Sequence, residues 1–245
     1  MSDTTGSRLQ QESELTTLTN AYAHHDYMVG IRRHLHSHPE LSNHEASTSA
    51  LIAREFDALG IGYVRAGEHG LVATIAGTRE DRMVALRADM DALPIVEENS
   101  HLDYISQVPG VMHACGHDGH VAMLLGAARI LMEQKSLLKG TVKLCFQQAE
   151  EVGDGTKEIL AELARHPMEA IFGIHLWSEL ESGLISVEPG ARMASVDVFE
   201  IRVRGAGTHG AYPNRGSIRS LQPRPSFSIA RRLPAARSTL WRPSP

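Results

Sequence analysis

The stretch that decides how this chain folds around its chemistry is MHACGHDGHVAMLLGAARILME, residues Met112–Glu133. Its second half is rich in Ala and Leu, which favours a helix. Its first half places five candidate metal ligands ahead of that helix: His113, Cys115, His117, Asp118 and His120. Gly116 and Gly119 allow the tight backbone that brings short side chains to one point. The stretch therefore predicts a metal site on a loop and a helix N-terminus.

The composition is typical of a globular protein. The chain has 245 residues, 42% of them hydrophobic, which is enough for one large domain or for one domain and part of another. It has no apolar run of about 18 residues and no apolar leader, so we expect a cytoplasmic protein without a membrane segment or signal peptide. The two cysteines, Cys115 and Cys145, argue against a disulfide framework. Cys145 lies in an apolar strand pattern and is expected in the core.

Three predicted strands each end in side chains that can bind a metal or orient its ligands. They are Met83–Ala88 followed by Asp89 and Asp91, Thr141–Gln147 followed by Glu150 and Glu151, and Ala170–Ile174 followed by His175. In an open α/β sheet, ligands bind at the carboxyl ends of the strands. The sequence therefore predicts that these side chains share one rim of one sheet with Cys115 and His117.

Further elements follow from helix and strand signals. We expect helices over Tyr22–His38 and Asn43–Leu59, the second with its first residue as N-cap and Gly60 as its stop. Gly70–Ala76 reads as a strand. Ser195–Arg204 alternates between apolar and polar residues, which indicates the first strand of a second domain.

The mixture of Cys, His and Glu favours a hydrolytic metal site. Structural zinc sites are usually closed sets of Cys and His, whereas a set rich in carboxylates resembles a site with an open position. In the pair Glu150-Glu151, one carboxylate can bind the metal and the other can take a proton from metal-bound water, whose pKa falls to about 7. A structural or adventitious cluster is the alternative.

The chain also resembles a known family. The segments that carry the resemblance are RRHLHSHPEL (Arg32–Leu41), RADMDALPI (Arg87–Ile95), HACGHDGH (His113–His120), QQAEE (Gln147–Glu151), GIHLW (Gly173–Trp177) and GAGTHGAYP (Gly205–Pro213). Their order and approximate spacing resemble the M20 metallopeptidase family. More narrowly they resemble its amidohydrolase branch, which includes hippurate hydrolase, N-acyl-amino-acid amidohydrolases and indoleacetyl-amino-acid hydrolases.

The resemblance implies a role for each matching residue. The implied metal ligands are Cys115, His117, Glu151 and His175. Glu150 is the implied general base, and His209 the implied lid-domain histidine that holds the substrate carbonyl or its oxyanion, unless it is a simple turn histidine. Asp89 and Asp91 are interpreted as groups that orient the ligands, because a ligating imidazole usually donates its other N–H to an acceptor.

The resemblance also implies a fold and a reaction. The expected fold is α/β: a zinc-peptidase-like catalytic domain over 1–192, with a mixed, largely parallel sheet flanked by helices, then the start of a truncated α+β lid or dimerisation domain over 193–216. The implied reaction is hydrolysis of N-acyl amino acids of the hippurate type with two divalent metal ions, zinc or manganese, with cobalt or nickel as alternatives. A dipeptidase or carboxypeptidase of the same family is the alternative activity. We expect a small-molecule substrate, a homodimer if the lid domain were complete, and neither nucleic acid nor membrane as a partner.

Residues 217–245 depart from the family pattern. They contain six Arg, five Pro and no acidic residue, so the 18 basic and 29 acidic residues before them give a net charge of −11. We interpret this segment as disordered and as the product of a frameshift; a basic tail that binds nucleic acid or anionic lipid is the alternative. Family members continue further and supply a last metal-ligating histidine. An inactive, truncated remnant that at most binds metal is therefore the alternative function.

Overall fold

The computed structural model describes residues 19–79, 81–187, 189–190, 206–207, 209 and 211–212. The chain divides into two compact units, Met1–Glu181 and Ser182–Pro245. The elements of the first unit are α2 (His25–Ser37), α3 (Ala46–Leu59), β1 (Gly62–Arg65), β2 (Leu71–Ile75), β3 (Met83–Asp89), α4 (His117–Glu133), η1 (Lys135–Leu137), β4 (Thr141–Gln147), η2 (Glu150–Val152), α5 (Thr156–Leu163) and β5 (Met168–Gly173). None of the described helices is both long and apolar enough to cross a membrane.

The strands form one five-stranded mixed sheet in the order β1-β2-β4-β3-β5. β1 and β2 pair antiparallel, as do β2 and β4, whereas β3 is parallel to both β4 and β5. Asp89 lies opposite Gln147, so the carboxyl ends of β3 and β4 are level. The α/β fold with a mixed sheet is confirmed, and the three strands that carry the candidate ligands end at the same edge.

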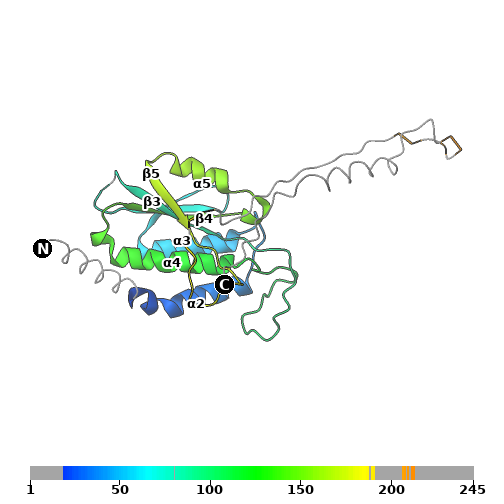
Figure 1. The fold of residues 1–245 in the computed structure, drawn as a ribbon, viewed down its shortest axis with the longest axis horizontal. Coiled ribbons are helices and arrows are strands. Elements are labelled where there is room, and N and C mark those ends of the chain that lie inside the picture. The colour runs from blue at the N-terminus through cyan, green and yellow to red at the C-terminus, as the bar shows by residue number, and fades with distance from the viewer. Residues whose placement is uncertain are drawn as a thin grey trace. The chain divides into compact units, whose positions relative to one another are not determined.

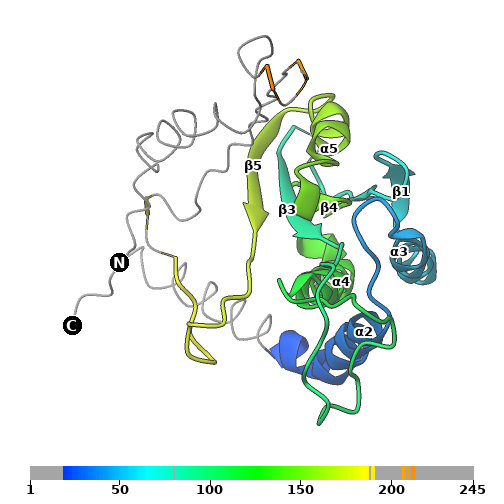
Figure 2. The same cartoon turned by 90° about the vertical axis from the view of Figure 1, so that its right-hand side faces the viewer.

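Helices cover both faces of this sheet (Figure 1). On one face, Ile52 and Phe56 of α3 and Leu125 of α4 pack with Leu71 of β2 and Phe146 of β4 in the larger core. On the other face, Ile159 and Leu163 of α5 pack with Val72 and Cys145. Figure 2 shows the same layers from the side, with α5 on one side of the strands and α4 with α2 on the other. Cys145 is fully buried, which confirms its predicted place in the core.

The predicted helices are present with altered starts. Residues 19–23 are helical, a turn follows at His24, and α2 begins at His25. α3 begins at Ala46 with Glu45 as its N-cap, so the prediction of Asn43 as N-cap is wrong. Asn43 instead has a left-handed backbone, with φ of 64°. Gly60 ends α3 in the left-handed conformation, as predicted.

The strand predictions hold except at their edges. β4 has the predicted bounds, and β2, β3 and β5 overlap theirs. β1 and α5 were not predicted; β1 is a four-residue, largely exposed edge strand. The strand expected over Ser195–Arg204 lies outside the described residues.

Candidate metal centre

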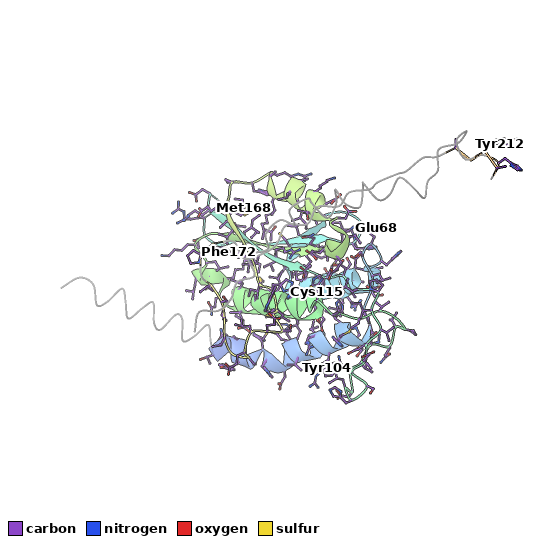
Figure 3. The ribbon with its side chains drawn as sticks, turned by 45° about the vertical axis from the view of Figure 1, so that its right-hand side comes forward. Glu68, Tyr104, Cys115, Met168, Phe172 and Tyr212 are labelled. Atoms are coloured by element: carbon purple, nitrogen blue, oxygen red, sulfur yellow. The ribbon has the colours of Figure 1, made fainter. Side chains whose placement is uncertain are left out.

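The cluster forms where the carboxyl ends of β3, β4 and β5 meet the first turn of α4. Cys115 precedes this helix, beside which Figure 3 labels it, and His117 is its first residue. The N-cap Gly116 has a φ of 88°, a conformation that glycine adopts without the steric cost of a Cβ. Placing the cluster on a loop and a helix N-terminus was therefore correct.

His117 belongs to three groups of close ligand atoms, two of which contain the predicted ligands. In the first group, the ligand atoms of Cys115, His117 and His175 all lie within 4.8 Å of one another. In the second, the same limit holds for His117, Glu150 and Glu151. Cys115 Sγ and His175 Nε2 are 3.5 Å apart. The structure thus brings together all four predicted metal ligands and the predicted base.

Two buried atoms in this cluster have no hydrogen-bond partner among the described residues: His117 Nε2 and Glu151 Oε1. They lie 3.7 Å apart, too far for a hydrogen bond. Glu150 Oε2 is 3.9 Å from the same imidazole nitrogen. Leaving buried polar atoms unpaired costs free energy. A metal ion would satisfy both atoms, so the residues present fit a divalent cation.

Asp91 orients the central histidine and ties the site together. Its Oδ1 accepts a hydrogen bond from His117 Nδ1 at 3.2 Å, which leaves Nε2 as the free ligand atom. Its Oδ2 accepts from the Ser42 hydroxyl at 2.6 Å and from the backbone N–H of Glu151 at 3.0 Å. One carboxylate therefore fixes residues from three separate segments.

The acidic side chains of the site would be stabilised in their ionised forms by a nearby positive charge. Burial, together with the charge of Glu151, raises the pKa of the Cys115 thiol to about 12. Burial also raises the pKa of Glu151 itself, although the charge of His117 opposes this. Burial opposes ionisation of Asp89 as well, but a hydrogen bond from His120 and nearby positive charges lower its pKa to about 2. A divalent cation among these groups would favour the ionised thiol and carboxylates.

The backbone that presents Glu150 is unusual. Ala149, immediately before it, is fully buried and has a φ of 54°, a left-handed conformation that costs energy in any residue with a Cβ. Its N–H donates to Glu45 Oε1 at 2.7 Å. The neighbouring Gln148 side chain accepts from the backbone N–H groups of His69 and Gly70. The turn after β4 is thus held by contacts from residues far away in the sequence.

His209 belongs to the second unit, which is described by itself. Its Nδ1 accepts a hydrogen bond from the backbone N–H of Ala211 at 3.2 Å, and its carbonyl accepts from the N–H of Tyr212 at 2.8 Å. These contacts are local to a turn. The role of His209 therefore stays a prediction.

His120 is one of the five candidate ligands in the sequence but not one of the four that the family resemblance implies, and the structure places it inside the site. It is 3% exposed and, with His117 and Asp89, forms a third group of close ligand atoms. Its spacing of three residues from His117 puts both on one face of a helix, and that is the signal that could have found it.

Fold and site together define a class: an α/β protein with a cysteine, histidine and carboxylate cluster suited to divalent metal at the carboxyl ends of its strands. Comparison with known proteins gives the family. Residues 85–234 match the sequence profile of peptidase family M20/M25/M40. The chain belongs to this family.

Individual relatives agree with this assignment. The chain is 43% identical over 190 residues to an N-acyl-L-amino acid amidohydrolase of Geobacillus stearothermophilus, covering 77% of this chain and 51% of the relative. It is 45% identical over 194 residues to thermostable carboxypeptidase 1 of Saccharolobus solfataricus, covering 77% and 49%. The crystal structure of the Bacillus subtilis YXEP protein, a dinuclear metal-binding peptidase from the M20 family, superposes with a TM-score of 0.61 at 40% identity, covering 65% of this chain and 45% of that one. The chain spans about half the length of the curated relatives it matches.

Proposed function

We propose that this chain carries the catalytic part of a metal-dependent amidohydrolase that cleaves the amide bond of N-acyl amino acids, including hippurate-type substrates. The observation that carries the proposal is the pair of unpartnered buried atoms, His117 Nε2 and Glu151 Oε1, within a cluster that includes a thiol and a second carboxylate. The similarity to an N-acyl-L-amino acid amidohydrolase supports the substrate class.

In this proposal Cys115, His117, Glu151 and His175 hold two divalent ions, zinc or manganese, with cobalt or nickel as alternatives. When bound, such ions polarise a carbonyl and lower the pKa of a coordinated water. Thiolate and imidazole suit zinc and other transition metals, and carboxylates tolerate all of them. The ligand set alone does not select one metal.

Glu150 is the proposed general base. Its side chain is 38% exposed, more than twice the 18% of Glu151, while its Oε2 lies within 3.9 Å of His117 Nε2. A carboxylate that is near the ligands yet open to a substrate can take a proton from the attacking water and deliver it to the leaving amine. The tight turn at Ala149 would hold it in that position.

The remaining proposals concern the second unit and the whole protein. His209 would hold the substrate carbonyl or its oxyanion, as a donor placed where negative charge develops. The domain limits 1–192 and 193–216, a homodimer formed through a complete lid domain, and a cytoplasmic location are likewise proposals. So is the interpretation of 217–245 as an aberrant tail.

A second candidate function is carboxypeptidase activity, which the 45% identity to a thermostable carboxypeptidase favours. Both activities hydrolyse an amide beside a free α-carboxylate, and they differ in what the acyl side carries. An acyl group suits the amidohydrolase, and a peptide suits the carboxypeptidase. A third candidate is an inactive chain that binds metal without turnover.

The test is amine release by the purified chain with added Mn²⁺ or Zn²⁺. The substrates are N-benzoylglycine, an N-acetyl amino acid and an indoleacetyl amino acid, compared with unblocked tripeptides of matched C-terminal residue. We expect amine release from the acylated substrates that depends on added metal, and we expect Glu150→Gln to abolish this release. Release from the tripeptides alone would favour the carboxypeptidase, and no release by a folded, metal-loaded chain would favour the inactive one.

A further inference from the structure

The backbone of Leu176, the residue that follows His175, is held on both sides by histidines. The backbone N–H of Leu176 donates to His120 Nε2 at 2.9 Å. The carbonyl of the same residue lies 2.6 Å from His175 Nδ1, which donates to it. With Nδ1 engaged in this way, the lone pair of His175 is on Nε2, the atom that lies 3.5 Å from Cys115 Sγ.

A carboxylate fixes the orientation of His120. Its Nδ1 lies 2.6 Å from Asp89 Oδ1, and because a carboxylate only accepts, this nitrogen carries the proton. Nε2 is then the acceptor that the Leu176 N–H requires. Both ring nitrogens of His120 are thereby used, so it has no free ligand atom although it lies among the candidate ligands.

The side chain of Leu176 packs against the same turn of α4. A Cβ added at Gly119 would lie 2.5 Å from Leu176 Cδ1, and one at Gly116 would lie 3.3 Å from it. Two residues without side chains therefore make the surface on which Leu176 rests. The loop after β5 is docked on α4 by a hydrogen bond and by close packing.

We propose that His120 is a positioning residue: held by Asp89, it fixes the backbone N–H of Leu176 against α4 and so aims His175 Nε2 at the metal. This inference rests on the proposed metal centre. In this role both ring nitrogens of His120 are used, one by Asp89 and one by the Leu176 N–H. If His120 were a metal ligand, Nε2 would bind the metal and could not accept the hydrogen bond from Leu176. Partners that orient ligands in this way typically change metal affinity by about 10- to 100-fold when removed.

The test measures the affinity of the chain for Zn²⁺ by competition with a chelator, in two backgrounds. His120→Ala and Gly119→Ala are each expected to weaken binding by about 10- to 100-fold. In a His175→Ala background the same substitutions are expected to have no further effect, because the ligand they position is gone. A merely structural role would weaken binding equally in both backgrounds, and that result would overturn the proposal.

Gly126→Ala is the matched control. It adds the same methyl group to the same helix, where it meets the flexible Met28 side chain of α2 rather than Leu176. We expect Zn²⁺ affinity within about threefold of wild type. The Co²⁺-loaded chain gives a second signature, since Cys115 and His175 contribute different bands. His120→Ala should change the ligand-field bands of bound Co²⁺ in the same way as His175→Ala and should keep the charge-transfer band of the Cys115 thiolate. Loss of the ligand-field bands together with the charge-transfer band would count against the proposal.

A measurement without metal separates this inference from the metal centre. In the metal-free chain the Leu176 amide should exchange slowly with solvent, and ¹⁵N spectra should show His120 protonated at Nδ1. In His120→Ala the Leu176 amide should exchange at least tenfold faster. If exchange is equally fast in both chains, the positioning role is wrong even where Zn²⁺ binds. If wild type binds no Zn²⁺ but shows this protection, the metal centre fails and the positioning of Leu176 stands.

Discussion

Glu45 accepts a hydrogen bond from the backbone N–H of Ala149 at 2.7 Å, across 104 residues of sequence. Both residues are fully buried. Burial raises the pKa of Glu45, which favours its neutral form. The bond links the start of α3 to the left-handed turn that presents Glu150.

Replacing Glu45 should therefore destabilise the chain, and the loss should depend on whether the new side chain can accept the hydrogen bond from the Ala149 N–H. Glu45→Ala leaves a buried N–H unpaired, and we expect the free energy of unfolding to fall by about 1–3 kcal/mol in urea titrations. Glu45→Gln keeps an acceptor oxygen for the Ala149 N–H, so its free energy of unfolding should fall clearly less. Equal losses for the two variants would show that this hydrogen bond does not hold the turn.

Cys115 should react slowly with alkylating agents when no metal is bound. A shift in its pKa from 9.0 to about 12 leaves about 1,000-fold fewer thiolates at neutral pH, and the thiolate is the reactive form. Iodoacetamide labelling of a Cys145→Ala chain, followed by mass spectrometry, measures this rate. Glu151→Gln removes the nearest charge that opposes the thiolate and should accelerate labelling. A rate close to that of a free cysteine peptide would contradict the prediction.

The environment of His36 should make the stability of the chain depend on pH. It is buried, and its Nδ1 and Nε2 donate to Asp118 at 2.8 Å and to Glu97 at 3.1 Å. The hydrogen bond with Asp118, aided by Glu97, raises the pKa of His36 above its ordinary 6.5. Because the folded pKa is raised, the stabilisation is complete below that ordinary value and is lost as pH rises through the folded pKa.

As the pH rises above about 6.5, the free energy of unfolding should therefore decrease more in wild type than in His36→Gln. Urea titrations of both chains across that range measure the difference. Parallel curves for the two chains would mean that His36 is not charged in the folded state.

Glu150→Gln should separate metal binding from turnover. The substituted side chain keeps its size but cannot take a proton, so amide hydrolysis should fall by about 100-fold or more. Affinity for Zn²⁺ should stay within about threefold of wild type, because the proposed ligands are untouched. A variant that keeps most of its turnover would remove Glu150 from the role of base.

The sequence predicted elements whose burial is continuous and missed those defined by distant contacts. β4 has the predicted bounds because all seven of its residues are buried and its middle is mostly apolar, with Val142, Leu144, Cys145 and Phe146. The start of α3 was misplaced because the side chain of Asn43 accepts a hydrogen bond from Gln148, 105 residues away, instead of capping the helix. α5 was missed because it has eight residues and its N-cap is a left-handed Gly155 without a capping side chain.

The candidate site was predictable to the extent that parallel strands bring their ends together. The positions of Glu150, Glu151 and His175 follow from the ends of β4 and β5, and those of Cys115 and His117 from the glycines before α4. The role of His120 was not predictable, because its hydrogen-bond partner is the backbone N–H of Leu176, 56 residues away in the sequence. Every residue except proline has a backbone N–H, so the residue type at position 176 does not indicate this hydrogen bond.

The proposed function depends on a metal centre formed by the side chains around His117. The most direct test is equilibrium dialysis of the folded, metal-free chain against Zn²⁺, followed by elemental analysis, for wild type, His117→Ala and the peripheral control His166→Ala. We expect tight binding by wild type and by His166→Ala, and loss of bound zinc in His117→Ala. His117 belongs to every candidate ligand group among the described residues. Equal zinc content in His117→Ala and wild type would contradict the proposed metal centre.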